Sequence, residues 1–402
     1  MNAEEDKAAS PRWGFILLMG VASSLSAFGM ASVVPALPTL SRALSTDYAS
    51  LQFVVSAYLL GLGLFQPIQG LLCDRFGRRP VFLAGFALFG LASLFASMAS
   101  SVAMLVLARF LQAMGVSVAT VVSRAIVRDS FEPGPAAVAL SFITAVMGVA
   151  PVLAPLVGGV IADYLGWRGI FWIHAGVSLF LVGILFTQLK ETRPADTESM
   201  SFGDLLRGGR FLVTQPGFMG PSLTYSFFSA SGFIFITVGA ALYETMFDMS
   251  GAEFGLLWSG LAFSFIAGAT SAGHLARRFG SARSQRIGMG CNGIATAAFV
   301  IAAFMTVAPM WLFSLSLALL MFANGVVQPL ALTAAVDDHP QLAGVAAGLS
   351  SSIAMLISMV SAITTGAIYD GTARGCAILM SAACVLAILS LRLGEKAHPI
   401  SR

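Results

Sequence analysis

Long, continuous apolar runs separated by short polar stretches dominate this chain. The run Phe15–Ala36 shows no alternation of apolar and polar side chains. A helix needs about 20 apolar residues to cross a hydrocarbon core of ~30 Å, whereas an outer-membrane β-barrel shows alternating segments of ~10 residues. A helix also satisfies its own backbone hydrogen bonds in lipid, so the pattern predicts membrane-spanning helices and an all-α polytopic membrane protein.

Twelve spans are expected, which the 402 residues accommodate with short connections. The predicted spans cover 14–36, 50–72, 80–99, 102–124, 136–162, 169–189, 218–243, 252–275, 285–306, 309–335, 343–368 and 374–392. The longest polar stretch lies between the sixth and the seventh span. The chain is therefore predicted to consist of an N-terminal six-helix bundle (1–189), a cytoplasmic linker (190–217) and a C-terminal six-helix bundle (218–402).

Composition excludes several classes of protein. Hydrophobic residues make up 57% of the chain and charged residues 10%, whereas a soluble protein has about 25% charged residues. A soluble enzyme, a disordered chain and a nucleic-acid binder are excluded. No disulfide framework and no metal site are expected from the four cysteines, because they lack paired or ligand-like spacing: Cys73, Cys291, Cys376 and Cys384. No cleavable signal peptide is expected either.

Basic residues predict the orientation in the membrane. If both termini are cytoplasmic, 18 of the 22 Lys and Arg residues lie on the cytoplasmic side. Such a bias is typical of cytoplasmic loops. We expect a multi-pass membrane protein with both termini in the cytoplasm.

The two predicted bundles repeat one another. The segment 70–77 (GLLCDRFG) is matched 203 residues later by 273–280 (GHLARRFG), each time after the second span of its half. A weaker echo pairs 159–163 with 366–370. Parallel six-helix repeats place a substrate site between the halves, near the middle of the membrane. The repeat thus favours a transporter over a membrane enzyme.

The loop after the second span carries the most specific motif, Gly70-x-Leu72-x-Asp74-Arg75-x-Gly77-Arg78-Arg79. With this motif the whole chain resembles the major facilitator superfamily. The resemblance implies the fold of that superfamily and a loop that locks one access state without touching substrate. The expected members of this conformational latch are Gly70, Asp74, Arg75, Gly77, Arg78 and Arg79. The alternative is that the arginines only anchor the loop on the positive side of the membrane.

A second motif lies in the fourth span, where Arg109, Gln112 and Gly115 are similar to the superfamily's R-x-x-Q-G-x-G element. Arg109 is expected about two turns inside the outer membrane face, where a charge costs several kcal/mol unless it faces a cavity or a partner. Gln112 shares its helix face. The resemblance implies a role in proton relay or in sensing substrate polarity; the alternative is snorkelling to the interface.

The fifth span resembles the G-P-x-x-G-G signature of antiporters, with Ala154 in the first glycine position. Prolines disturb the helix ladder, and small residues permit close packing. The alternatives are an antiporter hinge, which the resemblance links to export, and simple packing. The residues concerned are Gly148, Pro151, Pro155, Gly158 and Gly159.

Shorter matches resemble the bicyclomycin and chloramphenicol resistance (Bcr/CflA-like) branch of the drug:proton antiporters: Pro35–Pro38, Ser123–Asp129, Gly166–Arg168, Phe171-Trp172 and Glu191–Pro194. Many members of that branch carry an acidic residue in the first span. Here the corresponding stretch, Ala27–Val34, holds no ionisable side chain. The identity of the proton-carrying group is therefore undetermined. The cavity is expected to favour neutral or anionic compounds.

Few other titratable side chains lie near the predicted spans. Asp129 is expected to be a surface partner of nearby arginines. Glu244 and Asp248 lie at an outer helix end, where solvation is cheap. His174 either titrates near neutral pH or is a buried, hydrogen-bonded histidine, and the second interpretation is preferred.

The cavity wall is expected, by resemblance, to come from the first, second, fourth, seventh, eighth and tenth spans. Large aromatic, thioether and amide groups in these spans suit a broad-substrate pocket. Besides Arg109, the candidates for the substrate and proton pathway are Phe28, Met30, Tyr58, Gln112, Tyr225, Trp258, Asn324 and Gln328.

Together these features predict a secondary active transporter, not an enzyme. It is expected to export small, mostly hydrophobic drugs or toxic compounds by proton antiport, with alternating access. The alternative is a proton-coupled importer or exporter of a specific organic anion or metabolite. We expect a monomer in the lipid bilayer that binds small molecules and protons, with no cofactor and no nucleic acid.

Overall fold

The computed structural model describes residues 12–193 and 201–397. Within these residues the chain forms helices and no strand, and twelve segments are long and apolar enough to cross a membrane. The predicted fold class is confirmed. The first predicted span, 14–36, is one helix only as far as Ala31, as described below.

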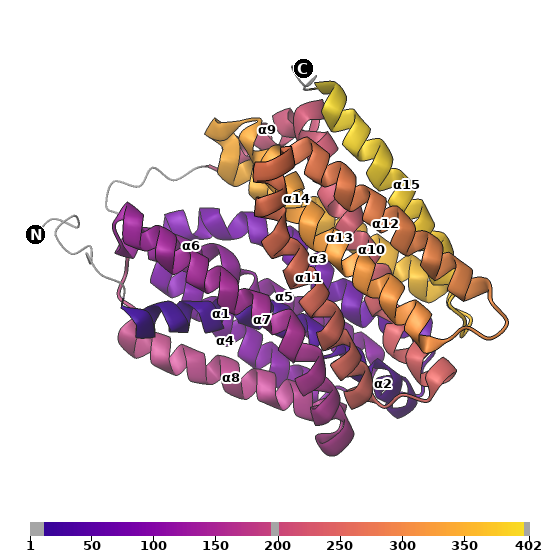
Figure 1. Ribbon diagram of the computed structural model, residues 1–402. Coiled ribbons are helices and arrows are strands. Elements are labelled where there is room, and N and C mark those ends of the chain that lie inside the picture. Colours follow the sequence, from indigo (N-terminus) through magenta and orange to yellow (C-terminus); the bar gives the residue numbers. More distant parts are fainter. Residues whose placement is uncertain (1–11, 194–200, 398–402) are drawn as a thin grey trace, which may run out of the picture.

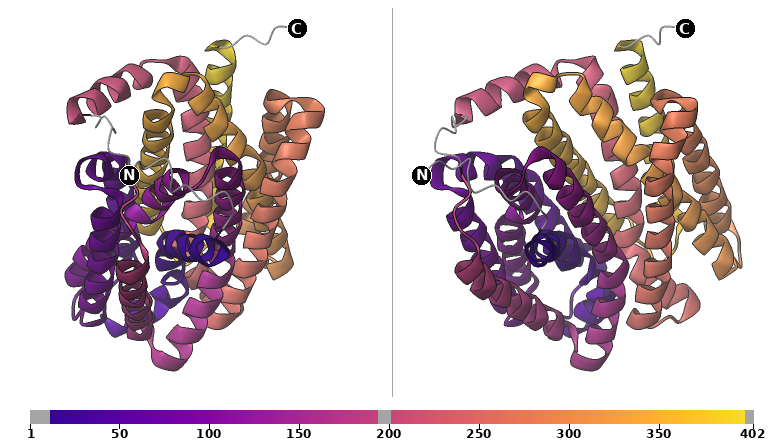
Figure 2. Two further views of the ribbon diagram at one scale, coloured as in Figure 1. Left: turned by 90° about the vertical axis from the view of Figure 1, so that its left-hand side faces the viewer. Right: turned by 60° about the vertical axis from the view of Figure 1, so that its left-hand side comes forward.

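The N-terminal half comprises α1 (Trp13–Ala31), η1 (Val34–Ala36), α2 (Leu37–Ala43), α3 (Tyr48–Phe76), α4 (Arg78–Ser97), α5 (Val102–Val116), α6 (Val118–Ser130), α7 (Pro133–Leu165) and α8 (Trp167–Gln188). The C-terminal half comprises α9 (Phe202–Val213), α10 (Pro216–Phe247), α11 (Gly251–Phe279), α12 (Ser281–Phe304), α13 (Met310–Asp337), η2 (Pro340–Leu342), α14 (Ala343–Ala367) and α15 (Arg374–Ala397). The two halves lie side by side in Figures 1 and 2.

The first span is broken near its outer end. α1 ends at Ala31, and the 3-10 turn η1 and the short helix α2 follow, each with a proline in its first two positions. Proline has no N–H, and its ring clashes with the carbonyl four residues earlier. Pro35 therefore prevents α1 from continuing, and the last carbonyls of α1 are left for other partners.

The predicted linker contains a helix. α9 begins with a capping box in which Ser201 and Asp204 bond each other's backbone N–H groups. Its buried Leu212 packs in a small apolar cluster with Val345 and Ala346 of α14. α9 thus lies against the C-terminal half (Figure 1).

The internal repeat is also a repeat of backbone geometry. Gly77 joins α3 to α4 with φ 96° and ψ 159°, and Gly280 joins α11 to α12 with φ 82° and ψ 155°. A positive φ costs glycine little because it has no Cβ. The same turn, at the same place in each half, supports the repeat read from the sequence.

We call the side that holds α9 and the end of α15 the inner side, and the side that holds η1 and α2 the outer side. α7 packs against α11, and α3 packs against α14, across the two halves. Toward the outer side a single apolar cluster includes residues of both halves, such as Leu40, Leu51, Phe235 and Trp258. Toward the inner side each half has its own cluster. The halves are therefore joined mainly through their outer parts.

Candidate functional site

Arg109 is a cation buried inside the N-terminal half, with 1% of its surface exposed. Its Nη1 donates hydrogen bonds to the carbonyl oxygen of Gly29 and to Oε1 of Gln112, both at 2.9 Å. Its guanidinium lies 4.1 Å from the centre of the Tyr58 ring. These neutral groups stabilise a charge that would otherwise be costly in the membrane.

Four helices meet around this arginine. Nε2 of Gln112 donates to Ser93 Oγ at 2.6 Å, and Ser93 Oγ donates to the carbonyl of Phe89 in α4. The Tyr58 hydroxyl of α3 donates to the carbonyl of Ser26 in α1 at 2.8 Å. The candidates Arg109, Gln112 and Tyr58 are thus brought together, and they link α1, α3, α4 and α5.

A second polar pocket lies beside the first. His174 of α8 is buried, and its Nε2 lies 2.8 Å from Ser32 Oγ, just beyond the end of α1. The rings of Phe28, Phe89 and Phe171 surround the imidazole at centroid distances of 5.8, 5.8 and 6.0 Å. Nδ1 is buried without a hydrogen-bond partner among the described atoms. The candidate Phe28 therefore packs on a histidine within its own half.

Two adjacent glycines of α7 contact two different helices. A Cβ on Gly158 would collide with the carbonyl of Ser32, and a Cβ on Gly159 would collide with the carbonyl of Gly251 in α11. Gly148, in contrast, has no atom within 4 Å of the place where its Cβ would be. Gly158 and Gly159 therefore allow α7 to pack closely against the end of α1 and against the C-terminal half. Gly148 makes no such contact.

The prolines of α7 lie on the same contact. α7 remains one helix through Pro151 and Pro155. A Cβ on Gly255 of α11 would collide with the carbonyl of Pro155, and Ser259 Oγ of α11 donates to the carbonyl of Val152. We refer to this close contact between α7 and α11 as the α7–α11 seam.

Polar contacts join the halves at the outer side. Arg42 of α2 and Glu244 of α10 form an ion pair at 2.7 Å. Asp163, at the end of α7, accepts a hydrogen bond from the backbone N–H of Ala252 at 3.0 Å. The N–H groups of a helix's first turn lack partners within the helix, and a carboxylate suits them. Asp163 thus caps α11 from the other half.

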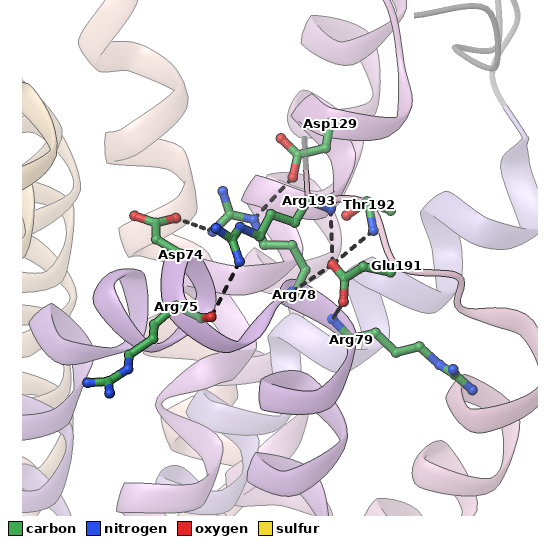
Figure 3. Close-up of polar contacts among 8 residues, drawn as sticks. All are labelled: Asp74, Arg75, Arg78, Arg79, Asp129, Glu191, Thr192 and Arg193. Atoms are coloured by element: carbon green, nitrogen blue, oxygen red, sulfur yellow. Dashed lines mark hydrogen bonds and ion pairs between the residues drawn. The ribbon is translucent and has the colours of Figure 1, made fainter. Parts of the chain in front are cut away.

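The loop between α3 and α4 holds a charge cluster (Figure 3). The Arg78 guanidinium contacts Asp74 at 2.7 Å and Asp129 at 3.1 Å. Asp129 and Arg78 lie 51 positions apart in the sequence. Arg78 therefore connects the inner ends of α3, α4 and α6.

Glu191 joins this cluster through its carboxylate. It accepts hydrogen bonds from the backbone N–H groups of Arg78, Arg79, Thr192 and Arg193 at 2.8 to 3.2 Å (Figure 3). Partial burial raises the pKa of Glu191, but the four N–H donors together lower it further, so the pKa lies below its ordinary value. Its carboxylate ties the end of α8 to the start of α4.

The remaining latch candidates have unequal surroundings. A Cβ on Gly77 would lie 2.5 Å from a carboxylate oxygen of Glu191, so the positive-φ turn and the carboxylate fit each other. Gly70 has open space around it. The Arg75 side chain is exposed, whereas its carbonyl accepts a hydrogen bond from Arg193 Nη1 at 3.3 Å.

The model of the Major Facilitator Superfamily matches residues 19–362. The chain belongs to this superfamily.

Named relatives span nearly the whole transporter. It is 29% identical over 384 residues to multidrug resistance protein D of Escherichia coli K12, covering 91% of this chain and 93% of the relative. It is 24% identical over 377 residues to the bicyclomycin resistance protein homolog of Haemophilus influenzae, covering 94% of each. A crystal structure of a bacterial homologue of the human lysosomal transporter Spinster shares the fold, with a TM-score of 0.79 at 17% identity over 97% of this chain and 98% of that chain. The resemblance to the drug:proton antiporters is therefore confirmed.

In the C-terminal half of this transporter, two candidates form one polar chain. Asn324 Nδ2 donates to the carbonyl of Leu320 at 2.9 Å and to Ser231 Oγ at 3.4 Å. Gln328 Nε2 donates to Asn324 Oδ1 at 2.9 Å. Asn324 is buried and Gln328 half-buried, so the amide chain runs along α13 from the interior toward the inner side.

The other candidates lie apart from this chain. Trp258 is buried and stacks on Phe235, with 5.8 Å between ring centres and 16° between planes, in the outer apolar cluster. Met30 packs at the junction of the outer cluster and the N-terminal one. Tyr225 is half-buried on the inner side, where it interacts electrostatically with Arg124 of the other half.

Residues of these contacts that were not among the candidates include Glu191, Asp163 and Ser32. Glu191 and Asp163 had signals: Glu191 begins a matched stretch, and Asp163 ends the weaker repeat echo. Ser32 had none, because a serine in an apolar run does not show which neighbour it contacts. All three act on residues far away in sequence.

Proposed function

We propose that this transporter exports small, mostly hydrophobic drugs or toxic compounds from the cytoplasm by antiport with protons. The observation that carries the proposal is the α7–α11 seam. Gly159 and Gly255 let backbones of opposite halves touch. A glycine contact of this kind permits close approach without interlocked side chains, and two halves that rock against each other need such a contact.

In the proposed cycle, the described state is closed on its outer side. The shared apolar cluster, the seam and the contact of Arg42 with Glu244 all lie there. Substrate enters between the inner parts of the halves, where Tyr225 and Gln328 lie, and leaves after the outer contacts open. The charge cluster around Arg78 keeps the inner ends of α3, α4 and α6 together as one moving body.

Arg109 acts in this cycle through its charge and position. A guanidinium remains protonated in proteins, so it does not itself release a proton. Its bond to the carbonyl of Gly29 places that charge on the last turn of α1, next to the break in the first span. Movement of α1 therefore changes the environment of the charge, which is what a coupling residue requires.

The relatives favour drugs over a specific metabolite as substrates, since their printed names refer to multidrug and bicyclomycin resistance. We further propose that the transporter works as a monomer in a bacterial inner membrane, with both termini in the cytoplasm.

A susceptibility panel tests the substrate class. Expression in an efflux-deficient bacterial host is expected to raise the inhibitory concentration of bicyclomycin, chloramphenicol or other apolar drugs. A variant with Gly159→Val serves as an inactive, membrane-inserted control. Unchanged susceptibility to every drug, together with uptake of an organic anion by the same cells, would replace the proposal by the metabolite alternative.

A further inference from the structure

Proton antiport requires a side chain that gains and loses a proton during the cycle. The first span carries no ionisable side chain between Trp13 and Leu40, and Arg109 keeps its proton. Another buried titratable group in the same half is His174, with 1% of its surface exposed. An imidazole is the side chain that ordinarily titrates between pH 5 and 8.

We propose that His174 is the proton-carrying residue of this transporter and that Nδ1 is the atom that gains and loses the proton. The inference rests on the proposed antiport. Nε2 lies 2.8 Å from Ser32 Oγ, and in the proposed tautomer it carries the proton and donates to that hydroxyl. Nδ1, the other ring nitrogen, has no partner among the described atoms, so its lone pair is open to a proton.

The surroundings of His174 make proton occupancy depend on conformation. α1 presents Ser32 and Phe28, α4 presents Phe89, and α8 itself presents Phe171. These groups are neutral.

The charged side chain that acts on the imidazole is Arg109 of α5. α7, the remaining neighbour of α8, carries Asp163 and Tyr164, and both are exposed at its outer end. A proton on His174 would therefore face a second positive charge without a carboxylate to offset it. The proton therefore leaves His174 in the described state, in which the outer side is closed.

Contacts of α1 link this proton to the movement of the halves. Arg109 holds the carbonyl of Gly29, and His174 holds the side chain of Ser32 three residues later. The Ser32 carbonyl lies against Gly158, and the next residue of α7, Gly159, lies against Gly251 of the other half. When the seam opens, α1 shifts relative to Arg109 and His174. The imidazole then separates from the guanidinium and takes up a proton from the outer side at Nδ1.

The cycle balances without further reactants. One proton binds Nδ1 from the outer solution when the outer side is open, and no other bond forms or breaks. Return to the outer-closed state brings Arg109 back beside His174, and the same proton leaves to the inner side. Export of drug and entry of the proton thus use opposite half-cycles, as antiport requires.

A substrate-free measurement tests the site directly. Spin labels on Tyr164→Cys and Val307→Cys, two exposed outer positions on opposite halves, report the outer distance by pulsed electron resonance in a background free of other cysteines. In the otherwise unchanged protein, acidification from about pH 8 to about pH 5 is expected to lengthen this distance. His174→Gln, which keeps an amide donor for Ser32, is expected to abolish the pH response.

His274→Gln is the matched control, because His274 is exposed and contacts only the Thr270 carbonyl of its own helix. It is expected to leave the pH response unchanged. An unaltered pH response in His174→Gln would overturn the proposal.

Transport separates this proposal from the proposed function. In proteoliposomes with chloramphenicol as probe, His174→Gln is expected to lose drug-evoked proton flux and to keep drug exchange in the absence of gradients. Proton flux that persists in His174→Gln would refute the role of His174 and leave the antiport intact. A pH response that disappears in His174→Gln, in a protein that moves no drug, would support the proton site and refute the drug substrate.

Discussion

Arg109 keeps its charge within the membrane through partners that carry no charge. A backbone carbonyl, an amide and an aromatic face surround it, and 1% of its surface is exposed. Each contact depends on the planar guanidinium, because two donors and one face are used at once. The role proposed for Arg109 therefore rests on this geometry as well as on its charge.

Arg109→Lys is expected to abolish most drug transport although it keeps a positive charge. A lysine ammonium has no planar face that could stack on Tyr58 while it donates hydrogen bonds to the Gly29 carbonyl and to Gln112. Transport in proteoliposomes, measured with thermal unfolding of the purified variant, checks this. Arg168→Lys is the control, because Arg168 reaches only the Ala99 carbonyl and the Trp167 ring at the outer side. Phenicol transport with intact proton dependence in Arg109→Ala would remove Arg109 from the mechanism.

Glu191 predicts a pH dependence of stability. Its pKa is lowered in the folded protein, so it stabilises the fold above the pKa of an unfolded glutamate, about 4.3, and this contribution disappears as the pH falls through the lower, folded value. Glu191→Gln is expected to lower the melting temperature at pH 7, and the difference from the unaltered protein should shrink below about pH 4.3.

The matched control for this experiment is Glu132→Gln. Glu132 is an exposed glutamate that precedes α7 and makes no capping hydrogen bond with its side chain. Its replacement is expected to leave the melting temperature unchanged at both pH values. A difference between Glu191→Gln and the unaltered protein that stays constant from pH 7 to strong acid would contradict the assigned role of the carboxylate.

At the scale of helices, the α7–α11 seam depends on the small size of Gly159 and Gly255. Gly159→Val is expected to force α7 away from Gly251, open the outer side and reduce transport strongly. Gly148→Val, on the same helix but with open space around it, should transport normally. Labelling of cysteines introduced at outer positions, with a membrane-impermeant thiol reagent, checks whether the outer side has opened. Equal effects of the two substitutions would show that the seam has no special role.

Sequence alone predicted the helices well because their main determinant, a long apolar run, is local. The match of Gly77 with Gly280 is also local in sequence, and the structure gives both positions the same positive-φ turn. The first span was predicted to end at residue 36, and α1 ends a few residues earlier, at Ala31, before the turn that contains Pro35. The helix α9 was missed within a stretch that was interpreted only as polar.

The candidate site was less predictable from sequence. Both faces of a membrane helix are apolar, so hydrophobic periodicity does not distinguish a lipid-facing Trp258 from a buried one. Contacts such as Arg78 with Asp129 or His174 with Ser32 join residues that are 51 and 142 positions apart. The intramembrane arginine was found because its charge is rare there, whereas the histidine was interpreted as an ordinary buried side chain.

At the scale of the whole molecule, the two halves meet mainly through their outer parts. Asp163 of α7 caps α11 of the other half, whereas the corresponding Asp370 of the repeat bonds only Thr372 in its own loop. Asp163→Ala is therefore expected to shift the population toward outer-open molecules, and Asp370→Ala is not. The outer distance between Tyr164→Cys and Val307→Cys measures this shift. Equal outer distances in the two variants would show that Asp163 does not favour the outer-closed state over the outer-open one.

Antiport of drug against protons is the central claim. It is tested most directly in proteoliposomes that contain the purified protein, an acidic interior and a pH-sensitive dye. External bicyclomycin or chloramphenicol is predicted to raise the interior pH as drug enters and protons leave, and Arg109→Ala is predicted to abolish this response. Drug movement without any change of interior pH, or a response only to an organic anion, would contradict the account.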